Sequence, residues 1–266
     1  MNHASCRLLS GTGASADPFR LDFRWDGPAP RAGQFFMVKP RRGGVFLGRP
    51  ISVAAWTPAD AGGGPATVTF LVARRGRGTL ELADMRPGEE AELTGPLGNA
   101  WTDFLPPANP ADGRSVALVG GGIGLAPFMA MLHENTGEGL GYVFHLYAGF
   151  RTDPGSRDTL WESARSKAGK VIIATEDGSS GHKGLVPDFL EPERHSAVCA
   201  CGPEPMIRAV ADRCAAAGVP CFVSLERRMA CGVGACLGCT VKTADGNRRC
   251  CADGPVFDAR EITFDG

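Results

Sequence analysis

The sequence lacks the features that mark membrane, secreted or nucleic-acid-binding proteins. Its charges nearly cancel, with 28 Lys and Arg against 29 Asp and Glu, whereas nucleic-acid-binding proteins usually carry a basic stripe. No run approaches the ~18 consecutive apolar residues of a membrane-spanning helix. The opening segment MNHASCRLLSGTG has no apolar core long enough for a signal peptide. We therefore expect a cytoplasmic protein whose partners include neither nucleic acid nor a membrane.

Cysteine, in contrast, is plentiful. The chain has ten cysteines, and in a reducing cytoplasm clustered cysteines more often bind metal or take part in chemistry than form disulfides. Five of them lie close to the C-terminus, three in MACGVGACLGC (229–239) and two adjacent at Cys250 and Cys251. This concentration predicts a metal or redox centre in the last part of the chain.

The first part of the chain, residues 1–108, shows no convincing helical periodicity. Short runs rich in Val, Phe and Thr are separated by Gly- and Pro-rich turns, a spacing typical of a small antiparallel barrel or sandwich. The expected strands are 34–40, 49–56, 67–73 and 90–97. The segment PPANPADG (106–113) then reads as a linker.

The second part, residues 109–226, alternates apolar runs with helical stretches. Continuous β-branched runs between helices predict a parallel sheet covered on both faces. The five expected strands are 115–122, 142–150, 171–177, 196–203 and 219–226. The expected helices are 125–135, 157–167, 185–190 and 204–218.

The last part, residues 227–266, follows neither pattern and is too small for a hydrophobic core of its own. A metal centre would supply the cross-links that such a small unit needs. The predicted fold is therefore a β-barrel, a five-stranded parallel α/β domain and a small cluster-binding domain.

The cysteine spacing points to the kind of centre. Cys231, Cys236 and Cys239 follow the C-x-x-x-x-C-x-x-C pattern of plant-type [2Fe–2S] proteins, and the intervening glycines leave backbone amides free to approach sulfur. The alternative is structural zinc, which usually shows two short ligand pairs. The spacing favours iron–sulfur, but it leaves open whether Cys250 or Cys251 is the fourth ligand.

A glycine-rich turn marks a candidate phosphate site. In VALVGGGIGLAP (116–127) a buried strand leads through Gly121, Gly122 and Gly124 into a helix. Glycine lets the backbone approach a pyrophosphate, and the helix N-terminus favours negative charge. The Rossmann fingerprint is incomplete, since Ala126 and Pro127 occupy its last positions, and a plain tight turn is the alternative.

The order of motifs along the chain resembles one protein family. RPIS (49–52), GRGT, GPLGN, GGGIGLAP, CGPEPM, SLERRMACGVGACLGC and CADGPVF succeed one another. This order is similar to that of the electron-transfer subunit of bacterial NAD-linked dihydroorotate dehydrogenase, a member of the ferredoxin-reductase superfamily. The cysteine segment with its DGPVF ending is the most specific of these motifs.

The resemblance implies FAD in the barrel, with Arg49 on the pyrophosphate and Ser52 near the flavin ring. The chain departs from many members of the family at Ala73, where they carry an arginine, and Arg74 or Arg75 would substitute for it. The implied FAD contacts are Arg49, Pro50, Ile51, Ser52, Leu71, Val72, Ala73, Gly78 and Thr79.

The resemblance also completes the other two sites. The family's fourth cluster ligand is separated from DGPVF by one residue, which selects Cys251. In the superfamily the tripeptide Cys201-Gly202-Pro203 lies near the nicotinamide of NAD, and its place after a parallel strand suits a ligand site. Cys201 is then expected to shape the pocket rather than to act as a nucleophile.

A chain of three carriers follows from this reading. NAD exchanges a hydride, a [2Fe–2S] cluster exchanges single electrons, and a flavin converts between the two. The implied partner is an FMN-containing catalytic dihydroorotate dehydrogenase subunit in a heterotetramer, which oxidises the substrate in pyrimidine biosynthesis. Glu176 and Asp177, which end the third strand of the sheet, favour NAD over NADP because they would repel a 2′-phosphate.

Three alternatives remain from the sequence alone. The first is an electron-transfer subunit of an NAD(P)H-linked complex of the sulfhydrogenase or transhydrogenase type. The second is a stand-alone reductase that feeds an oxygenase. The third alternative is a zinc-stabilised binding module whose nucleotide loops have lost their function.

Overall fold

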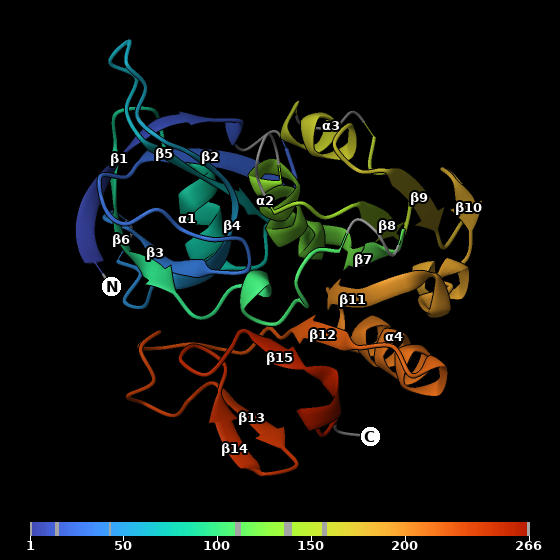
Figure 1. Cartoon of the computed structure of the whole chain (residues 1–266). Coiled ribbons are helices and arrows are strands. Elements are labelled where there is room, and N and C mark those ends of the chain that lie inside the picture. Colours follow the sequence, from blue (N-terminus) through green and yellow to red (C-terminus); the bar gives the residue numbers. More distant parts are fainter. Residues whose placement is uncertain are drawn as a thin grey trace.

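The computed structural model describes residues 2–13, 16–42, 44–109, 113–135, 140–155 and 159–264. Three parts are arranged side by side: a barrel, an α/β sheet and a smaller C-terminal segment below both (Figure 1). Residues 110–112 of the expected linker and 157–158 of the expected second helix lie outside the described residues. No helix in the described ranges is long and apolar enough to cross a membrane.

The barrel is closed by six antiparallel strands in the order β1-β2-β5-β4-β3-β6, which confirms the predicted architecture. Its core contains Trp25, Phe36 and Phe70, which stack edge to face. The strands are β1 (Asn2–Gly11), β2 (Phe19–Arg24), β3 (Phe35–Pro40), β4 (Arg49–Thr57), β5 (Thr67–Val72) and β6 (Glu90–Leu97). The short helix α1 (Arg77–Ala83) follows β5.

The second sheet has seven strands in the order β10-β9-β8-β7-β11-β12-β15. The five predicted parallel strands are all present, and β10 extends them on one side. On the other side β15, from the cysteine-rich segment, adds in antiparallel orientation. The strands are β7 (Ser115–Gly121), β8 (Phe144–Phe150), β9 (Lys170–Thr175), β10 (His182–Lys183), β11 (His195–Cys201), β12 (Cys221–Ser224) and β15 (Val256–Asp258).

Helices cover both faces of this sheet, as the continuous apolar runs predict. Helices α2 and α3 lie on one face and α4 on the other (Figure 1). The three are α2 (Ala126–Glu134), α3 (Thr159–Arg165) and α4 (Glu204–Ala217). The described residues also form five 3-10 turns: Trp101–Asp103, Gly122–Leu125, Val186–Phe189, Pro192–Arg194 and Ala259–Glu261.

Successive residues of the central strands enter two separate cores. On β7, Val116 and Leu118 pack into the core that contains α2, α3 and the barrel, whereas Ala117 and Val119 pack into the core that contains α4. Because side chains alternate along a strand, the sheet separates the two cores.

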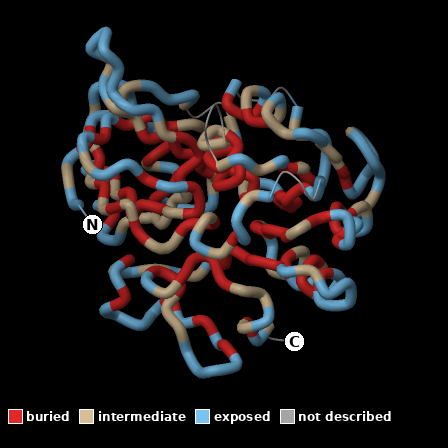
Figure 2. Tube along the Cα trace, viewed as in Figure 1, coloured by how far each residue is buried: buried red, intermediate tan, exposed pale blue. Residues whose placement is uncertain are grey.

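The C-terminal segment is held in the second core. Its hairpin, β13 (Thr240–Thr243) and β14 (Gly246–Arg249), projects away from the sheet. Cys239, Cys250 and Cys251 share the second core with Met37 and Leu97 of the barrel. Buried stretches therefore run from the sheet into this segment, while much of the hairpin is exposed (Figure 2).

Candidate cofactor sites

The cysteine loop between β12 and β13 directs backbone amides at sulfur. Cys231 Sγ accepts N–H bonds from Val233 and Cys236, both at 3.4 Å. Gly234 N donates to Cys251 Sγ at 3.1 Å, across 17 residues of sequence. Gly234 has φ +81°, a conformation that glycine adopts without strain. The loop conformation therefore provides donors that stabilise sulfur anions.

The ionisation of the thiols follows from these contacts. Bonds from the amides of Val233 and Cys236 lower the pKa of Cys231 to about 6, so this sulfur is a thiolate at neutral pH. Burial, together with a hydrogen bond between the two side chains of Cys239 and Cys251, raises the pKa of Cys251 to about 12 in the absence of metal. A cation at this position would be needed to remove that proton.

The four sulfurs influence one another's ionisation, and Cys231 also acts on Cys251. The side chain of Cys231 interacts with that of Cys236, and the side chain of Cys251 interacts with that of Cys239. Cys231, Cys236 and Cys239 have the spacing of a two-iron cluster, and the bond from Gly234 N to Cys251 Sγ brings a fourth sulfur to the same loop.

The Cys250 side chain points away from the other sulfurs of the loop. Its Sγ donates to the Leu225 carbonyl at 3.0 Å, and the residue is completely buried. Burial raises the pKa of this thiol to about 12. The geometry therefore places Cys251, not its neighbour, among the loop sulfurs.

The barrel brings Arg49 of β4 against the start of α1. A Cβ on Gly78 would lie 2.4 Å from Arg49 Nε, so the guanidinium lies directly over this glycine. Arg49 Nη1 donates to the Leu47 carbonyl at 2.8 Å, and Thr79 Oγ1 accepts from Arg75 N at 2.9 Å. Three of the predicted FAD contacts thus lie together at the start of one helix.

The other predicted FAD contacts lie on two neighbouring strands. Pro50, Ile51 and Ser52 continue β4 and are half-buried. Leu71 and Val72 end the adjacent β5 and are buried, and Ala73 follows them half-buried.

Arg74 carries a feature that fits an anionic cofactor. Its Nε and Nη2 are buried and have no hydrogen-bond partner among the described residues. A buried charge without a partner is costly, and a guanidinium binds phosphate well. Of the two arginines next to Ala73, Arg75 is exposed, so Arg74 is the one placed to replace the family's arginine.

The two loops of the predicted NAD site press against each other. A Cβ on Gly124 would lie 2.3 Å from the Cys201 carbonyl oxygen, and one on Gly121 would lie 2.7 Å from Pro203 Cδ. Gly202 has φ +150°, and a Cβ on it would lie 2.9 Å from Gly121 N. Gly122, at φ +55°, would direct a Cβ into open space. The loops are therefore close-packed, with Gly122 facing outward.

Cys201 is buried in this contact. Burial raises the pKa of its thiol to about 12, and the thiolate is the nucleophilic form of cysteine. Its environment fits a residue that shapes the pocket.

The cysteine loop also touches the barrel directly. A Cβ on Gly232 would lie 2.5 Å from Met37 Cγ and 3.2 Å from Leu97 Cδ1. Met37 on β3 is paired with Pro50 on β4. One strand therefore separates the cysteine loop from the RPIS strand.

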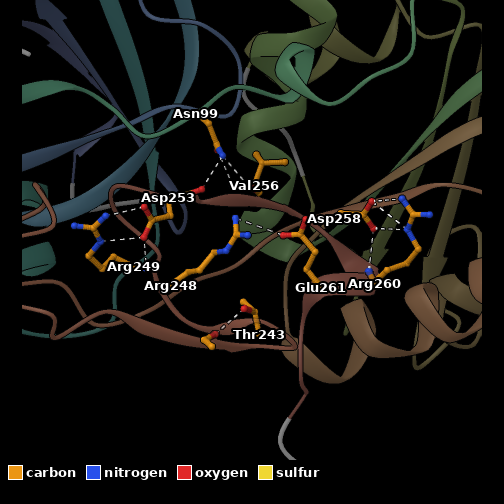
Figure 3. A network of polar contacts seen from close by, with 10 residues as sticks. Asn99, Thr243, Arg248, Arg249, Asp253, Val256, Asp258, Arg260 and Glu261 are labelled. Carbon is orange, nitrogen blue, oxygen red and sulfur yellow. Dashed lines mark hydrogen bonds and ion pairs between the residues drawn. The ribbon is translucent and has the colours of Figure 1, made fainter.

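One residue in this region had no role assigned from the sequence. Asn99 ends the GPLGN motif, and its side chain bonds to the backbone of Asp253 and Val256 in the DGPVF motif (Figure 3). Both motifs are visible in the sequence, but nothing in it indicates that they meet.

Two family models match the chain. The iron-sulfur cluster binding domain of dihydroorotate dehydrogenase B matches residues 226–263, and the oxidoreductase NAD-binding domain matches residues 118–212.

Similar proteins were also found by sequence and by structure. The chain is 41% identical over 233 residues to a dihydroorotate dehydrogenase B (NAD(+)) electron transfer subunit of Clostridium perfringens, with 88% of this chain and 87% of the relative covered. It is 36% identical over 264 residues to the corresponding subunit of Caldanaerobacter subterraneus, with 97% of each covered. A solved NADH-dependent reduced ferredoxin-NADP oxidoreductase, studied for flavin-based electron bifurcation, superposes with a TM-score of 0.79 at 26% identity and covers 98% of this chain and 90% of that chain.

Proposed function

The chain belongs to the family of dihydroorotate dehydrogenase B electron transfer subunits, and we propose that it passes electrons from a catalytic subunit through a [2Fe–2S] cluster and FAD to NAD⁺. The donor is the FMN of that catalytic dihydroorotate dehydrogenase subunit. The product is orotate, so the reaction belongs to pyrimidine biosynthesis.

The contact between the cysteine loop and the barrel is the observation that carries this proposal. Gly232 in the loop abuts Met37, and Met37 is paired with Pro50 in the strand assigned to FAD. Such packing gives the loop and the flavin-binding strand a short, fixed separation, which single-electron transfer between their cofactors requires.

We assign the cluster to Cys231, Cys236, Cys239 and Cys251. When bound, the cluster would exchange single electrons, and FAD would supply the chemistry that combines two of them with a proton as the hydride that NAD⁺ accepts. The role of the protein is to hold these groups: the amides of Val233 and Gly234 stabilise sulfur charge.

The flavin site is assigned to the surface formed by β4, β5 and the start of α1. Arg49 and Arg74 neutralise the pyrophosphate, and Gly78 leaves room for the Arg49 side chain. The remaining contacts are those named from the sequence: Pro50, Ile51, Ser52, Leu71, Val72, Ala73 and Thr79.

NAD is assigned to the glycine turn at the carboxyl ends of β7 and β11, where ligands bind in open parallel sheets. The assigned turn is Gly121, Gly122 and Gly124: Gly122 faces outward toward the pyrophosphate, whereas Gly121 and Gly124 let the turn pack against Cys201-Gly202-Pro203, which borders the nicotinamide. Exposed Glu176 and Asp177 follow β9 and would repel a 2′-phosphate, which favours NAD over NADP.

The proposal includes the organisation around these sites. Three functional units span 1–108, 109–226 and 227–266, although β15 of the last unit completes the sheet of the second. Two copies of this chain assemble with two catalytic subunits in the cytoplasm.

The test is anaerobic co-purification with the FMN-containing catalytic subunit, followed by an absorption spectrum and an assay of NAD⁺-dependent orotate formation. We expect flavin and sulfide-to-iron bands and orotate formation that requires this chain. Cys236→Ser abolishes the iron bands and orotate-linked NADH formation, whereas Cys6→Ser, in barrel strand β1, leaves both within about twofold of the wild type.

Each alternative has its own outcome. A colourless, zinc-containing protein would identify a binding module. Flavin and iron bands without orotate formation would assign the chain to a sulfhydrogenase- or transhydrogenase-type complex, and reduction of an oxygenase component would identify a stand-alone reductase.

A further inference from the structure

We propose that Asn99 is a positioning residue that clamps the loop after Cys251 to the flavin barrel and so fixes the cluster relative to the flavin. The clamp joins GPLGN (95–99), at the end of β6, to DGPVF (253–257), which leads into β15 (Figure 3). This inference rests on the proposed function, since it concerns the separation of the two cofactors assigned above.

The hydrogen bonds use both N–H donors and the acceptor oxygen of the Asn99 amide. Nδ2 donates to the carbonyls of Asp253 at 3.1 Å and Val256 at 2.9 Å, and Oδ1 accepts from Val256 N at 2.9 Å. The backbone adds a fourth bond, from Asn99 N to the Gly254 carbonyl at 2.8 Å. Only a side chain with both a donor and an acceptor satisfies this set.

Close packing reinforces the same contact. Gly98 has φ +75°, and a Cβ there would lie 2.5 Å from Pro255 Cδ and 2.7 Å from the Gly254 carbonyl oxygen. The two motifs are therefore in van der Waals contact immediately beside the hydrogen bonds, with no room for a side chain at residue 98.

The clamp extends to the sulfurs through Asp253. Its carboxylate accepts from Arg249 N at 2.7 Å, Nε at 2.9 Å and Nη2 at 2.8 Å. Arg249 Nη1 approaches the Gly234 carbonyl at 3.5 Å, and Gly234 N donates to Cys251 Sγ. A contiguous set of polar contacts thus joins Asn99 in the barrel to a cluster ligand.

The test compares Asn99→Ala with Asn247→Ala in the purified complex with the catalytic subunit. Asn247 lies exposed on β14 of the same segment and is the matched control. We expect hydrogen exchange at residues 252–258 to rise about tenfold in N99A, as the loss of buried hydrogen bonds predicts. NADH should reduce the flavin at the wild-type rate, while the following bleaching of the iron absorbance slows about tenfold.

A second variant guards against a folding failure. Asn99→Asp keeps the shape and the acceptor but sets a carboxylate oxygen against two carbonyls, and it should raise exchange at 252–258 while FAD stays bound. Wild-type exchange in N99D, or equal behaviour of N99A and N247A, would overturn the clamp. An absence of iron and flavin from the wild type would instead refute the proposed function, and the exchange measurement would still test the clamp.

Discussion

The parallel sheet and the cysteine-rich segment are stabilised in different ways. All seven residues of β7 are buried, and its aliphatic side chains supply two cores by the hydrophobic effect alone. The hairpin strand β14 has no fully buried residue, and Cys239, Cys250 and Cys251 take much of the place of aliphatic residues in the segment. The sheet is stabilised chiefly by buried aliphatic side chains, whereas the segment depends on sulfur ligation and on the barrel beside it.

The largest expected effect separates the two adjacent cysteines of that segment. Cys251→Ser removes a predicted ligand, so we expect iron to fall from about two per chain to near zero. The segment should then unfold at a lower temperature than the sheet, since metal binding is also folding free energy. Iron analysis and thermal melting followed by circular dichroism measure both effects.

Cys250→Ser is the matched control for this comparison. Serine can still donate to the Leu225 carbonyl, so iron should be retained at a stability cost on the order of 1 kcal/mol. Loss of iron in C250S with retention in C251S would reverse the assignment and remove the distinction between ligand and core cysteine.

The same contrast explains what was visible in the sequence. The five parallel strands were predicted because each is a continuous apolar run. Strands β1 and β2 were not, since NHASCRLLSG and FRLDFR mix charged with apolar residues. β15 is only three residues long, and its place in the sheet depends on pairing with β12.

The site residues also divide into those that local spacing predicts and those that depend on the fold. Spacing identified three loop cysteines and the glycine turn, because their chemistry is local. It did not choose between Cys250 and Cys251, which differ in the direction their sulfurs point. The contact of Asn99 with Val256 joins residues 157 apart in the chain, and nothing local in the sequence specifies it.

The barrel combines features of the sheet and of the cysteine-rich segment. Arg74 tests whether the barrel also needs a bound ligand. Its core is mainly apolar, but the buried Nε and Nη2 of Arg74 lack a partner among the described residues. If FAD phosphate supplies that partner, Arg74→Ala should weaken FAD binding by about tenfold to a hundredfold, the loss of a charge-assisted hydrogen bond. Flavin fluorescence during titration of the apoprotein measures the change.

Arg75→Ala is the control, because Arg75 is exposed and only its backbone N–H is engaged, by Thr79. Its FAD affinity should stay within about twofold of the wild type, since exposed ion pairs contribute little. Equal affinities in R74A and R75A would show that the barrel, like the sheet, needs no ligand to satisfy its buried charge.

The smallest expected effect concerns the junction of barrel and sheet domain. Glu134, in the last turn of α2, accepts from Ala32 N at 2.6 Å, and burial raises its pKa to about 7 despite the attraction of Arg31. A raised carboxyl pKa means that the folded state holds its proton more tightly than the unfolded chain, so stability falls as pH rises from about 4.5 to about 7.

Glu134→Gln keeps the acceptor and removes the charge. After allowance for solvent screening, it should stabilise the protein by on the order of 1 kcal/mol at pH 8, a few degrees in melting temperature, and by almost nothing at pH 4.5. Glu162→Gln, in an exposed ion pair with Arg165 on α3, should lack this pH dependence. A melting temperature of E134Q that tracks the wild type at both pH values would mean that water reaches this carboxylate, and that the junction is as open as the hairpin surface.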